Sequence, residues 1–262
     1  MNTTNIKTKT RTILRRANGF TRRLSMTEIL LGFLVIVPAY AYCMPIIVSA
    51  MIKYVALTFH LSVTVNGITA YLNLINDGLL MIAIVAFLYH FMKRQWKDFK
   101  KNKAQILFYG CVIGMVLTYG ASIIGSLLVS LFTNTTTSVN QNDVVTLMKS
   151  YPAIMFFSAV IFAPILEECL FRGLIFTFFR KYNRILAYVI SGFLFGFVHV
   201  MSSVFAGNVS EMIQMIPYAL MGTVFAYIYE SQDNIYASIA THMTNNLVSL
   251  LLVTFTGGLF FR

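Results

Sequence analysis

The chain has 262 residues, of which 58% are hydrophobic and only 11% are charged. Soluble globular domains carry roughly 25% charged residues, so too little polar surface is present here for a soluble protein of this length. The formal net charge of +11 would suit a nucleic-acid-binding protein. The positions of the basic residues, described below, give them another role, so no nucleic-acid partner is expected.

Long apolar runs recur along the chain, and about 20 apolar residues suffice to cross the hydrocarbon core of a bilayer. The runs are continuous rather than alternating, which indicates helices and not the strands of a β-barrel. The sequence therefore predicts an all-α polytopic membrane helix bundle with about seven transmembrane helices. The predicted spans are 29–52, 71–92, 105–132, 153–179, 185–203, 212–229 and 236–256.

These spans divide the chain into three regions. Residues 1–28 form a basic N-terminal segment, residues 29–150 hold three helices, and residues 151–262 form a bundle of four. A Thr-, Asn- and Ser-rich segment, 133–150, is predicted as the loop between the two sets of helices. The basic segment 93–103 has two interpretations, a solvated loop or an amphipathic helix on the inner membrane surface.

Most Lys and Arg residues gather in alternate loops, which the positive-inside rule places in the cytoplasm. The chain is therefore predicted to be a multi-pass cell-membrane protein with a cytoplasmic N-terminus and an outside C-terminus. Topology and attraction to the anionic lipid of the bilayer explain the basic excess. These residues are Lys7, Lys9, Arg11, Arg15, Arg16, Arg22 and Arg23 before the first span, Lys93, Arg94, Lys97, Lys100, Lys101 and Lys103 after the second, and Arg180, Lys181 and Arg184 after the fourth.

Ionisable residues are unevenly distributed among the predicted spans. Asp77 and His90 lie near the ends of the second span and His60 lies in a loop, so all three are expected to be solvated. Deeper in a span, an ionisable residue costs about 2.5–3.5 kcal/mol on insertion scales, which makes it a candidate for function. Such residues concentrate in three later segments, Glu167-Glu168-x-x-x-Arg172, Phe195-x-x-x-His199 and His242-x-x-x-Asn246.

Helical spacing sorts these polar residues. Residues four apart share one helix face, so Glu168 is predicted to pair with Arg172, which lowers the insertion cost of both charges. Glu167 points about 100° away from Glu168, toward another span. The sequence thus predicts a cluster in the bundle that consists of Glu167, His199, His242 and Asn246.

The predicted depths of the two histidines disagree. At ~1.5 Å per residue from the inner ends of their spans, His199 lies about 21 Å deep and His242 about 10 Å. The two side chains meet only if a span boundary is displaced or the helices are staggered or tilted. We expect either that the fifth span starts near residue 188 or that the seventh begins deeper in the bundle.

The three motifs, in this order and on separate helices, resemble those of the CPBP family, also called the Abi family. This family includes the type II CAAX prenyl endopeptidases and bacterial relatives linked to bacteriocin processing or self-immunity. The resemblance covers about 153–250, and Gly173 after the arginine also matches the family's common form.

The resemblance implies a role for each motif residue. Glu167 is expected to be the base that activates a water molecule, and His199 to position that water. Donors aimed at an oxyanion contribute about 2.7–4 kcal/mol each in related chemistry, and His242 and Asn246 are expected to supply them. The two residues expected to hold their helix in place are Glu168 and Arg172.

Zinc is the alternative for this site, with Glu167, His199 and His242 as its ligands and one open position. The sequence contains no His-Glu-x-x-His motif, and one carboxylate cannot readily serve as ligand and base at once. We therefore favour a metal-free mechanism that requires no cofactor.

The predicted function is an intramembrane endopeptidase that acts on a membrane-associated protein or peptide. The alternative is a non-catalytic membrane partner, in bacteriocin self-immunity or in the regulation of a membrane sensor protein. Motif residues often drift in relatives of that kind, and none has drifted here. A transporter or proton relay is the weakest interpretation, because the sequence shows no repeated halves.

Overall fold

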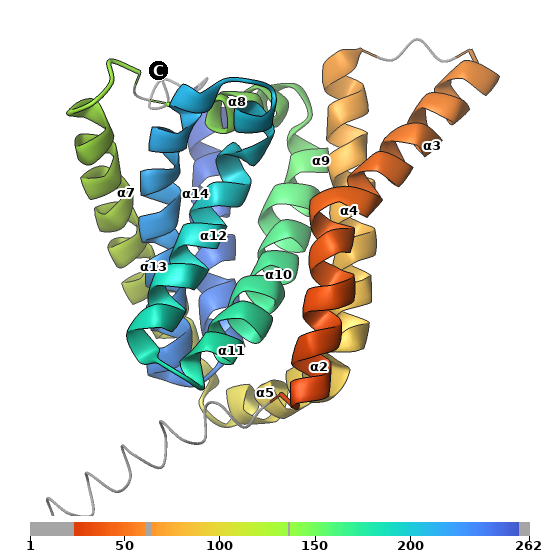
Figure 1. Cartoon of the computed structure of the whole chain (residues 1–262). Helices are drawn as coiled ribbons and strands as arrows, with labels where there is room; N and C mark the ends of the chain where they lie inside the picture. The colour runs from red at the N-terminus through yellow and green to blue at the C-terminus, as the bar shows by residue number, and fades with distance from the viewer. Residues whose placement is uncertain (1–23, 61–63, 136, 257–262) are drawn as a thin grey trace, which may run out of the picture.

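A computed structural model describes residues 24–60, 64–135 and 137–256, and within these ranges the chain is helical and contains no strand. Six helices in the described ranges are long and apolar enough to cross a membrane. Figure 1 shows them gathered into a bundle that runs between two ends of the molecule. The predicted all-α polytopic membrane bundle is therefore confirmed. The six helices are Met26–Thr58, Val65–Phe87, Lys103–Ser130, Pro152–Arg180, Arg184–Phe205 and Val209–Gln232.

Several of these spans are interrupted by π-helical segments. The first consists of α2 (Met26–Leu31), η1 (Gly32–Ile36), η2 (Ala39–Cys43) and α3 (Met44–Thr58), and the second is α4 (Val65–Phe87). The third consists of α6 (Lys103–Phe108), η3 (Tyr109–Gly114) and α7 (Met115–Ser130). The fourth consists of α9 (Pro152–Met155), η4 (Phe156–Phe162), α10 (Ala163–Glu168), η5 (Cys169–Phe176) and α11 (Thr177–Arg180). Then come α12 (Arg184–Phe205), the 3₁₀ turn η6 (Val209–Gln214) and α13 (Met215–Gln232).

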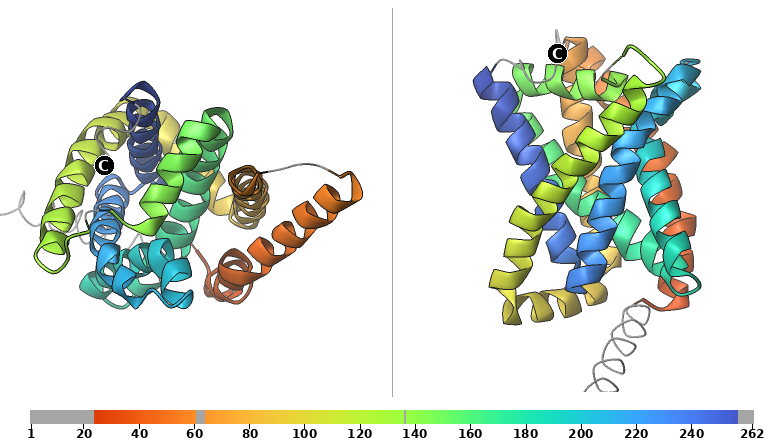
Figure 2. Two further views of the ribbon diagram at one scale, coloured as in Figure 1. Left: turned by 90° about the horizontal axis from the view of Figure 1, so that it is seen from above. Right: turned by 90° about the vertical axis from the view of Figure 1, so that its left-hand side faces the viewer.

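The predicted seventh span is α14 (Ile235–Thr256), a helix of 22 residues. Figure 2 shows α14 running the height of the bundle, where it packs against α13 and η3. It is not among the six apolar helices described above, because polar residues such as His242 and Asn246 lower its mean hydropathy. The polar side chains that make α14 a candidate for function therefore also make it less apolar than a typical transmembrane helix.

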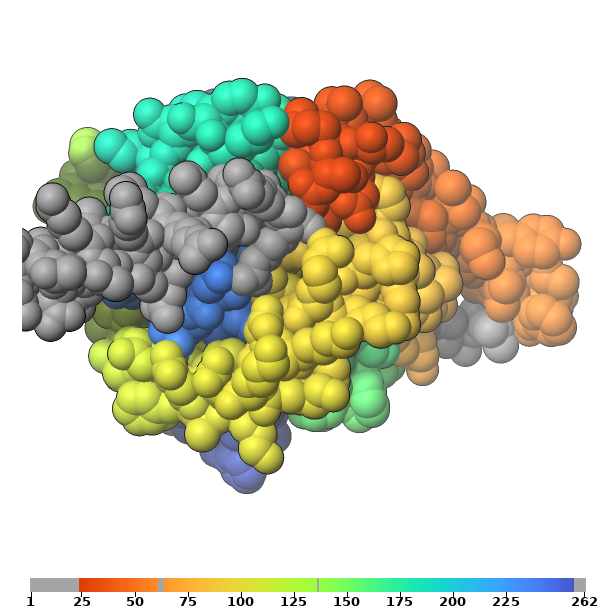
Figure 3. Space-filling view, turned by 90° about the horizontal axis from the view of Figure 1, so that it is seen from below, coloured from red at the N-terminus to blue at the C-terminus, as the bar shows by residue number. Residues whose placement is uncertain are grey.

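One end of the bundle carries the basic residues. The helix α5 (Tyr89–Lys101) lies across this end and buries Phe91 and Met92 while its Lys and Arg side chains are exposed. Residues 93–103 are therefore mostly an amphipathic helix, and the solvated-loop interpretation is wrong. Figure 3 shows α5 beside the start of α2 on this end of the molecule, which also carries the α11–α12 turn with Lys181 and Arg184. We call this end the basic face. The predicted basic segment 1–28 lies mostly outside the described residues.

The opposite end is covered by a helix that the sequence analysis missed. Residues 133–150 were predicted as a loop, but α8 (Val139–Ser150) lies across the top of the bundle (Figure 1). The Ser138 side chain caps α8 by accepting a hydrogen bond from the Gln141 backbone N–H at 3.0 Å. Polar composition hid this helix, since only one side of it is buried, through Val145, Leu147 and Met148.

The second span is displaced from its predicted position of 71–92. Its helix α4 begins at Val65, after the cap Thr64, and ends at Phe87, where the chain turns into α5. The polar first turns of α4 concealed its start. The shift places Asp77 in the middle of a transmembrane helix instead of near its end.

The two helices α12 and α13 approach each other unusually closely. Gly192 and Gly196 lie one turn apart on the contact, and a Cβ added at Gly196 would lie 2.7 Å from the Met215 carbonyl oxygen. Small residues spaced in this way allow transmembrane helix backbones to pack closely. This contact fixes the position of α12, which carries His199.

Candidate active site

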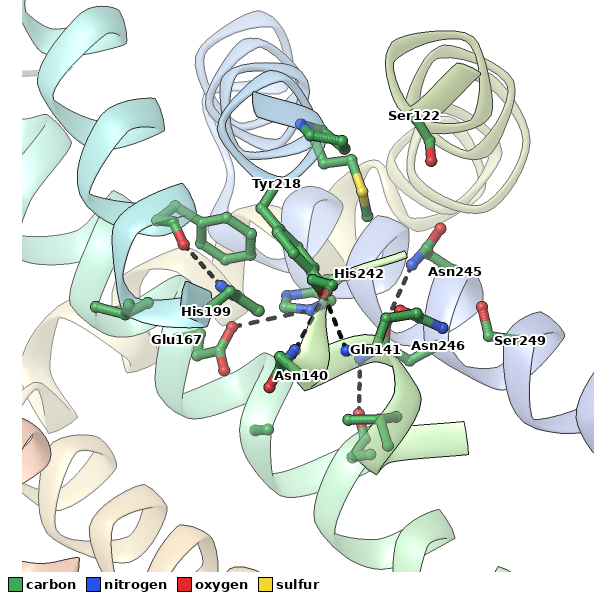
Figure 4. Close-up of a pocket in the computed structure, with 18 of the residues that line it drawn as sticks. Ser122, Asn140, Gln141, Glu167, His199, Tyr218, His242, Asn245, Asn246 and Ser249 are labelled. Atoms are coloured by element: carbon green, nitrogen blue, oxygen red, sulfur yellow. Dashed lines mark hydrogen bonds and ion pairs between the residues drawn. The ribbon is translucent and has the colours of Figure 1, made fainter. Parts of the chain in front are cut away.

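A cavity of about 780 Å³ lies inside the bundle. The four residues of the predicted cluster all line it, and Figure 4 shows their side chains directed toward one shared space. Residues of the α8 segment form the upper wall. Glu168 and Arg172, the predicted supporting pair, are completely buried and do not line the cavity. The predicted lining residues are Glu167, His199, His242 and Asn246.

Glu167 lies on α10, a short α-helical segment between the π segments η4 and η5. π segments place the partner of a carbonyl five residues later and are frequent at functional sites. Here the residue five positions after Ala159 is Pro164, which has no N–H to donate. The Asn246 side chain donates to the Ala159 carbonyl oxygen instead, at 2.8 Å. The irregular backbone beside Glu167 is thereby tied to α14.

Glu168 and Arg172 form the predicted ion pair, with Nη1 of Arg172 3.0 Å from Oε1 of Glu168. A second guanidinium nitrogen donates to the Gly222 carbonyl oxygen at 2.6 Å. The same Oε1 of Glu168 lies 3.2 Å from Nδ1 of His242. The pair therefore does more than hold its own helix, because it also orients an imidazole of the cavity wall.

This contact fixes the roles of the His242 nitrogens. A carboxylate oxygen only accepts, so Nδ1 of His242 is the donor to Glu168. The other nitrogen, Nε2, lies 4.0 Å from Oε2 of Glu167. That distance is too long for a direct hydrogen bond, and Oε2 of Glu167 is buried without a hydrogen-bond partner among the described residues. The two atoms thus face each other across a gap that a small polar group can bridge.

His199 approaches the same space from α12. Its Nδ1 donates to the Phe195 carbonyl oxygen one turn earlier, at 2.7 Å, which leaves Nε2 for the cavity. The imidazole stacks on the Tyr218 ring, with centroids 4.5 Å apart and planes 17° apart. The Phe195 ring contacts both histidines, with ring centroids 4.7 Å from His199 and 5.7 Å from His242.

The start of α14 explains how the two histidines meet despite their different positions in sequence. Asn234 and Ile235 at this start are almost completely buried. The Ile235 backbone N–H donates to the Gln95 side chain of α5 at 3.0 Å, so α5 covers the helix end. The start of α14 is thus buried under α5, as expected if the seventh span begins deeper in the bundle. The other expectation is wrong, because α12 begins at Arg184 and not near residue 188.

Asp77 was expected to be solvated near a membrane interface, and this expectation is wrong. The longer α4 carries Asp77 to the cavity wall. Its Oδ2 accepts a hydrogen bond from the Ser158 hydroxyl at 2.7 Å, and its Oδ1 lies 3.3 Å from the Asn76 amide nitrogen. The same expectation was stated for His60 and His90. Both histidines are exposed, as predicted.

Tyr218 is a cavity residue that the sequence analysis did not find. Its hydroxyl lies 2.8 Å from the Ser138 hydroxyl and accepts from the Asn140 side chain at 3.3 Å. The ring stacks on His199, so Tyr218 connects the α8 segment to the site (Figure 4). No motif marks this residue among the 14 tyrosines of the chain. Its position becomes visible only when α8 is recognised as a helix.

The donor set does not fit a metal ion as it lies. Within the part of the chain that the structure describes, no three His, Cys, Asp or Glu side chains are arranged to hold one. Two of the three predicted ligands face each other at 4.0 Å. The third, His199, has no contact within ion-pair distance of Glu167 among the described residues.

The fold and this cavity define a class of protein, a multi-pass membrane protein with a carboxylate, two imidazoles and amides gathered inside its helix bundle. The sequence model of the family described as "Type II CAAX prenyl endopeptidase Rce1-like" matches residues 149–248. This segment holds the three motifs, so over these residues the chain is similar to the CPBP family, as the motifs predicted.

Curated relatives are distant. A Lactococcus lactis protein named "UPF0177 protein YvdC" is 25% identical over 160 residues, which cover 61% of this chain and 56% of its own. The Bacillus subtilis protein "Putative membrane peptidase YdiL" is 23% identical over 174 residues, which cover 66% of this chain and 67% of its own. The chain thus spans little more than half the length of the first relative. No solved structure matches the chain significantly.

Proposed function

We propose that the chain is an intramembrane endopeptidase in which Glu167 activates a water molecule. The observation that supports this most directly is the gap between Oε2 of Glu167 and Nε2 of His242, 4.0 Å across, on the wall of an internal cavity. In the part of the chain that the structure describes, Oε2 of Glu167 has no hydrogen-bond partner. A buried carboxylate oxygen without a partner is costly unless a ligand or water uses it.

In the proposed reaction Glu167 takes a proton from a water molecule. The oxygen of that water attacks the carbonyl carbon of the peptide bond. The carbonyl becomes a tetrahedral oxyanion. Glu167 then returns the proton to the peptide nitrogen, the C–N bond breaks, and a carboxyl group and an amine result. His199 would orient the water through Nε2, because Nδ1 already donates to the Phe195 carbonyl.

His242 and Asn246 are the proposed donors to the oxyanion. Asn246 uses one amide hydrogen for the Ala159 carbonyl, which leaves the second for a substrate. His242 would need a proton on Nε2 in addition to the one on Nδ1, so it would act as an imidazolium beside Glu168. Donors fixed in this way cost little reorganisation when negative charge develops.

A cleavage assay in lipid vesicles with a library of membrane-associated peptides tests the proposal. Glu167→Gln keeps the shape and removes the base, and we expect it to lower the cleavage rate by about 10²–10⁴-fold. His199→Ala is expected to lower the rate as well. Asp98→Asn is the matched control, because it neutralises a carboxylate that is 51% exposed on α5, far from the cavity wall.

Two outcomes would contradict the proposal. If Glu167→Gln and His199→Ala retained the full biological effect, the chain would act as a binding partner instead. If a chelator abolished cleavage and added zinc restored it, the metal-free mechanism would be wrong. We expect chelation to leave the rate unchanged, since the donor set does not fit a metal ion.

We also propose that the basic face is cytoplasmic, since Lys- and Arg-rich ends of membrane bundles face inward. The α8 end would then face outward. Single cysteines introduced at Asp98 and at Gln141, in a background without the three natural cysteines, test this. An impermeant thiol reagent applied to whole cells should label position 141 and spare position 98.

A further inference from the structure

The described lining of the cavity carries more acidic side chains than Lys and Arg side chains, and the proposed reaction does not explain this excess. The cavity is lined by two carboxylates, Asp77 and Glu167, and among the described residues no Lys or Arg lines it. The nearby buried guanidinium of Arg172 is engaged with Glu168 and Gly222 behind the wall. The proposed imidazolium of His242 lies beside Glu167 and Glu168, so a molecule that fills the cavity meets Asp77 without a compensating cation among the described residues.

Asp77 is held in one orientation. It lies midway along α4, and its two carboxylate oxygens are hydrogen-bonded by Ser158 and Asn76 from two sides. Donors that fix a carboxylate restrict its direction without neutralising it. Within the described ranges, no Lys, Arg or His lies within ion-pair distance of Asp77. It is also close enough to interact electrostatically with Glu167.

Placing such a group inside a membrane bundle is unfavourable, at about 2.5–3.5 kcal/mol on insertion scales. Ionisable residues at this depth usually pair with one another or mark a path or binding site for a charged ligand. The base of the proposed reaction is Glu167, which leaves Asp77 without a part in the chemistry. A cationic group on the ligand would give Asp77 the missing partner.

We propose that Asp77 is a specificity-determining residue, and that the substrate is a peptide with a positively charged side chain beside the scissile bond. This inference rests on the proposed endopeptidase function. The Lys or Arg of the substrate would lie against α4 while its peptide carbonyl lies between Glu167 and His242. The same cavity disfavours a substrate that places a free carboxylate at this position.

Binding of uncleaved peptides separates this inference from the proposed reaction. The Glu167→Gln protein is placed in nanodiscs of zwitterionic phosphatidylcholine, so that anionic lipid does not attract the peptides. Peptide libraries of one length carry a single central Lys, norleucine or Glu. Norleucine matches the Lys side chain without its charge. In the Glu167→Gln background Asp77 is the remaining carboxylate among the described lining residues, so charge preference reports on Asp77 whether or not any bond is cleaved.

We expect the Lys library to bind at least about tenfold more tightly than the norleucine library, as for a charge-assisted hydrogen bond in a sheltered site, and the Glu library to bind most weakly. Adding Asp77→Asn should remove the preference, whereas Asp77→Glu should keep it. Asn73→Ala, one turn away on the same wall, should change both affinities equally and keep their ratio.

Equal binding of the Lys and norleucine libraries to the Glu167→Gln protein would overturn the inference, and this comparison needs no change at Asp77. Persistence of the preference in folded Asp77→Asn protein would also overturn it. So would loss of the preference in Asn73→Ala. Absence of cleavage by the unmodified protein would contradict the proposed function alone, because the binding ratio does not depend on cleavage.

Discussion

The N-terminal helices α2–α7 and the C-terminal helices α9–α14 use the membrane differently. Half of the most apolar stretch of Pro152–Arg180 is buried inside the protein, against 17% of that of Met26–Thr58. The C-terminal helices surround the cavity and bury charged and amide side chains. The N-terminal helices expose most of their apolar surface, as lipid contact requires, and supply a smaller share of the lining, from α4 and from α7.

This difference shows where polar residues in a membrane sequence are informative. In the C-terminal region, Glu167 and His199 stand out because the apolar runs around them are long on both sides. In the N-terminal region, Asp77 has the same kind of position but stands near polar residues at the start of α4. Residues buried inside the bundle can therefore be recognised from the sequence in the C-terminal region, whereas Asp77 in the N-terminal region cannot.

The largest effect on stability is expected from breaking the buried ion pair of the C-terminal region. Arg172→Met leaves Glu168 as a buried charge without its partner and should destabilise the protein by about 3–5 kcal/mol. The double variant Glu168→Gln with Arg172→Met removes both charges and should recover part of this loss. Unfolding in mixed micelles, followed by circular dichroism, measures both free energies. A double variant less stable than Arg172→Met would contradict the ion-pair explanation.

The fold class and the spacing of polar residues within each span could be inferred from sequence, because continuous apolarity and helical spacing are local properties. That the cluster's residues meet across three helices was expected from the resemblance of their motifs, and not from spacing alone. The i,i+4 pairing of Glu168 with Arg172 survives even though Arg172 lies in a π segment. What could not be inferred depends on contacts between helices. The depth of His242 is set by Gln95 from α5, and the place of Tyr218 is set by α8.

A smaller effect is expected at the close contact of α12 with α13, which also belongs to the C-terminal region. Gly196→Ala would place a Cβ 2.7 Å from the Met215 carbonyl oxygen, so the two helices must separate. Overpacking of this kind costs about 1–3 kcal/mol. Because α12 carries His199, cleavage should fall more than the loss of folded protein explains. Gly120→Ala is the matched control, since nothing lies within 4 Å of its added Cβ.

Tyr218 tests whether the α8 end and the site are coupled. Tyr218→Phe keeps the stacking on His199 but loses the contacts with Ser138 and Asn140, worth about 0.5–1.5 kcal/mol each. We expect a moderate fall in the cleavage rate for Tyr218→Phe and a larger one for Tyr218→Ala, which also removes the stack. A structural role alone would lower stability and rate in parallel. If Tyr218 positions His199, kcat should fall while the fraction of folded protein stays the same, and the pH dependence of kcat should shift.

The smallest effect is expected on the lipid-facing side of the N-terminal region. Leu34 in η1 is 72% exposed within the protein, so Leu34→Ala exchanges one lipid-facing apolar side chain for a smaller one. The free energy of unfolding of the Leu34→Ala protein in lipid should change by less than about 0.5 kcal/mol, as for other exposed positions. Its cleavage rate should equal that of the unmodified protein. The contrasting residue in the same region is Asp77, for which charge preference, and not stability, should respond. A large loss of stability in Leu34→Ala would mean that this face is covered by protein, and the division between a lipid-facing and a cavity-facing side of the N-terminal helices would have to be redrawn.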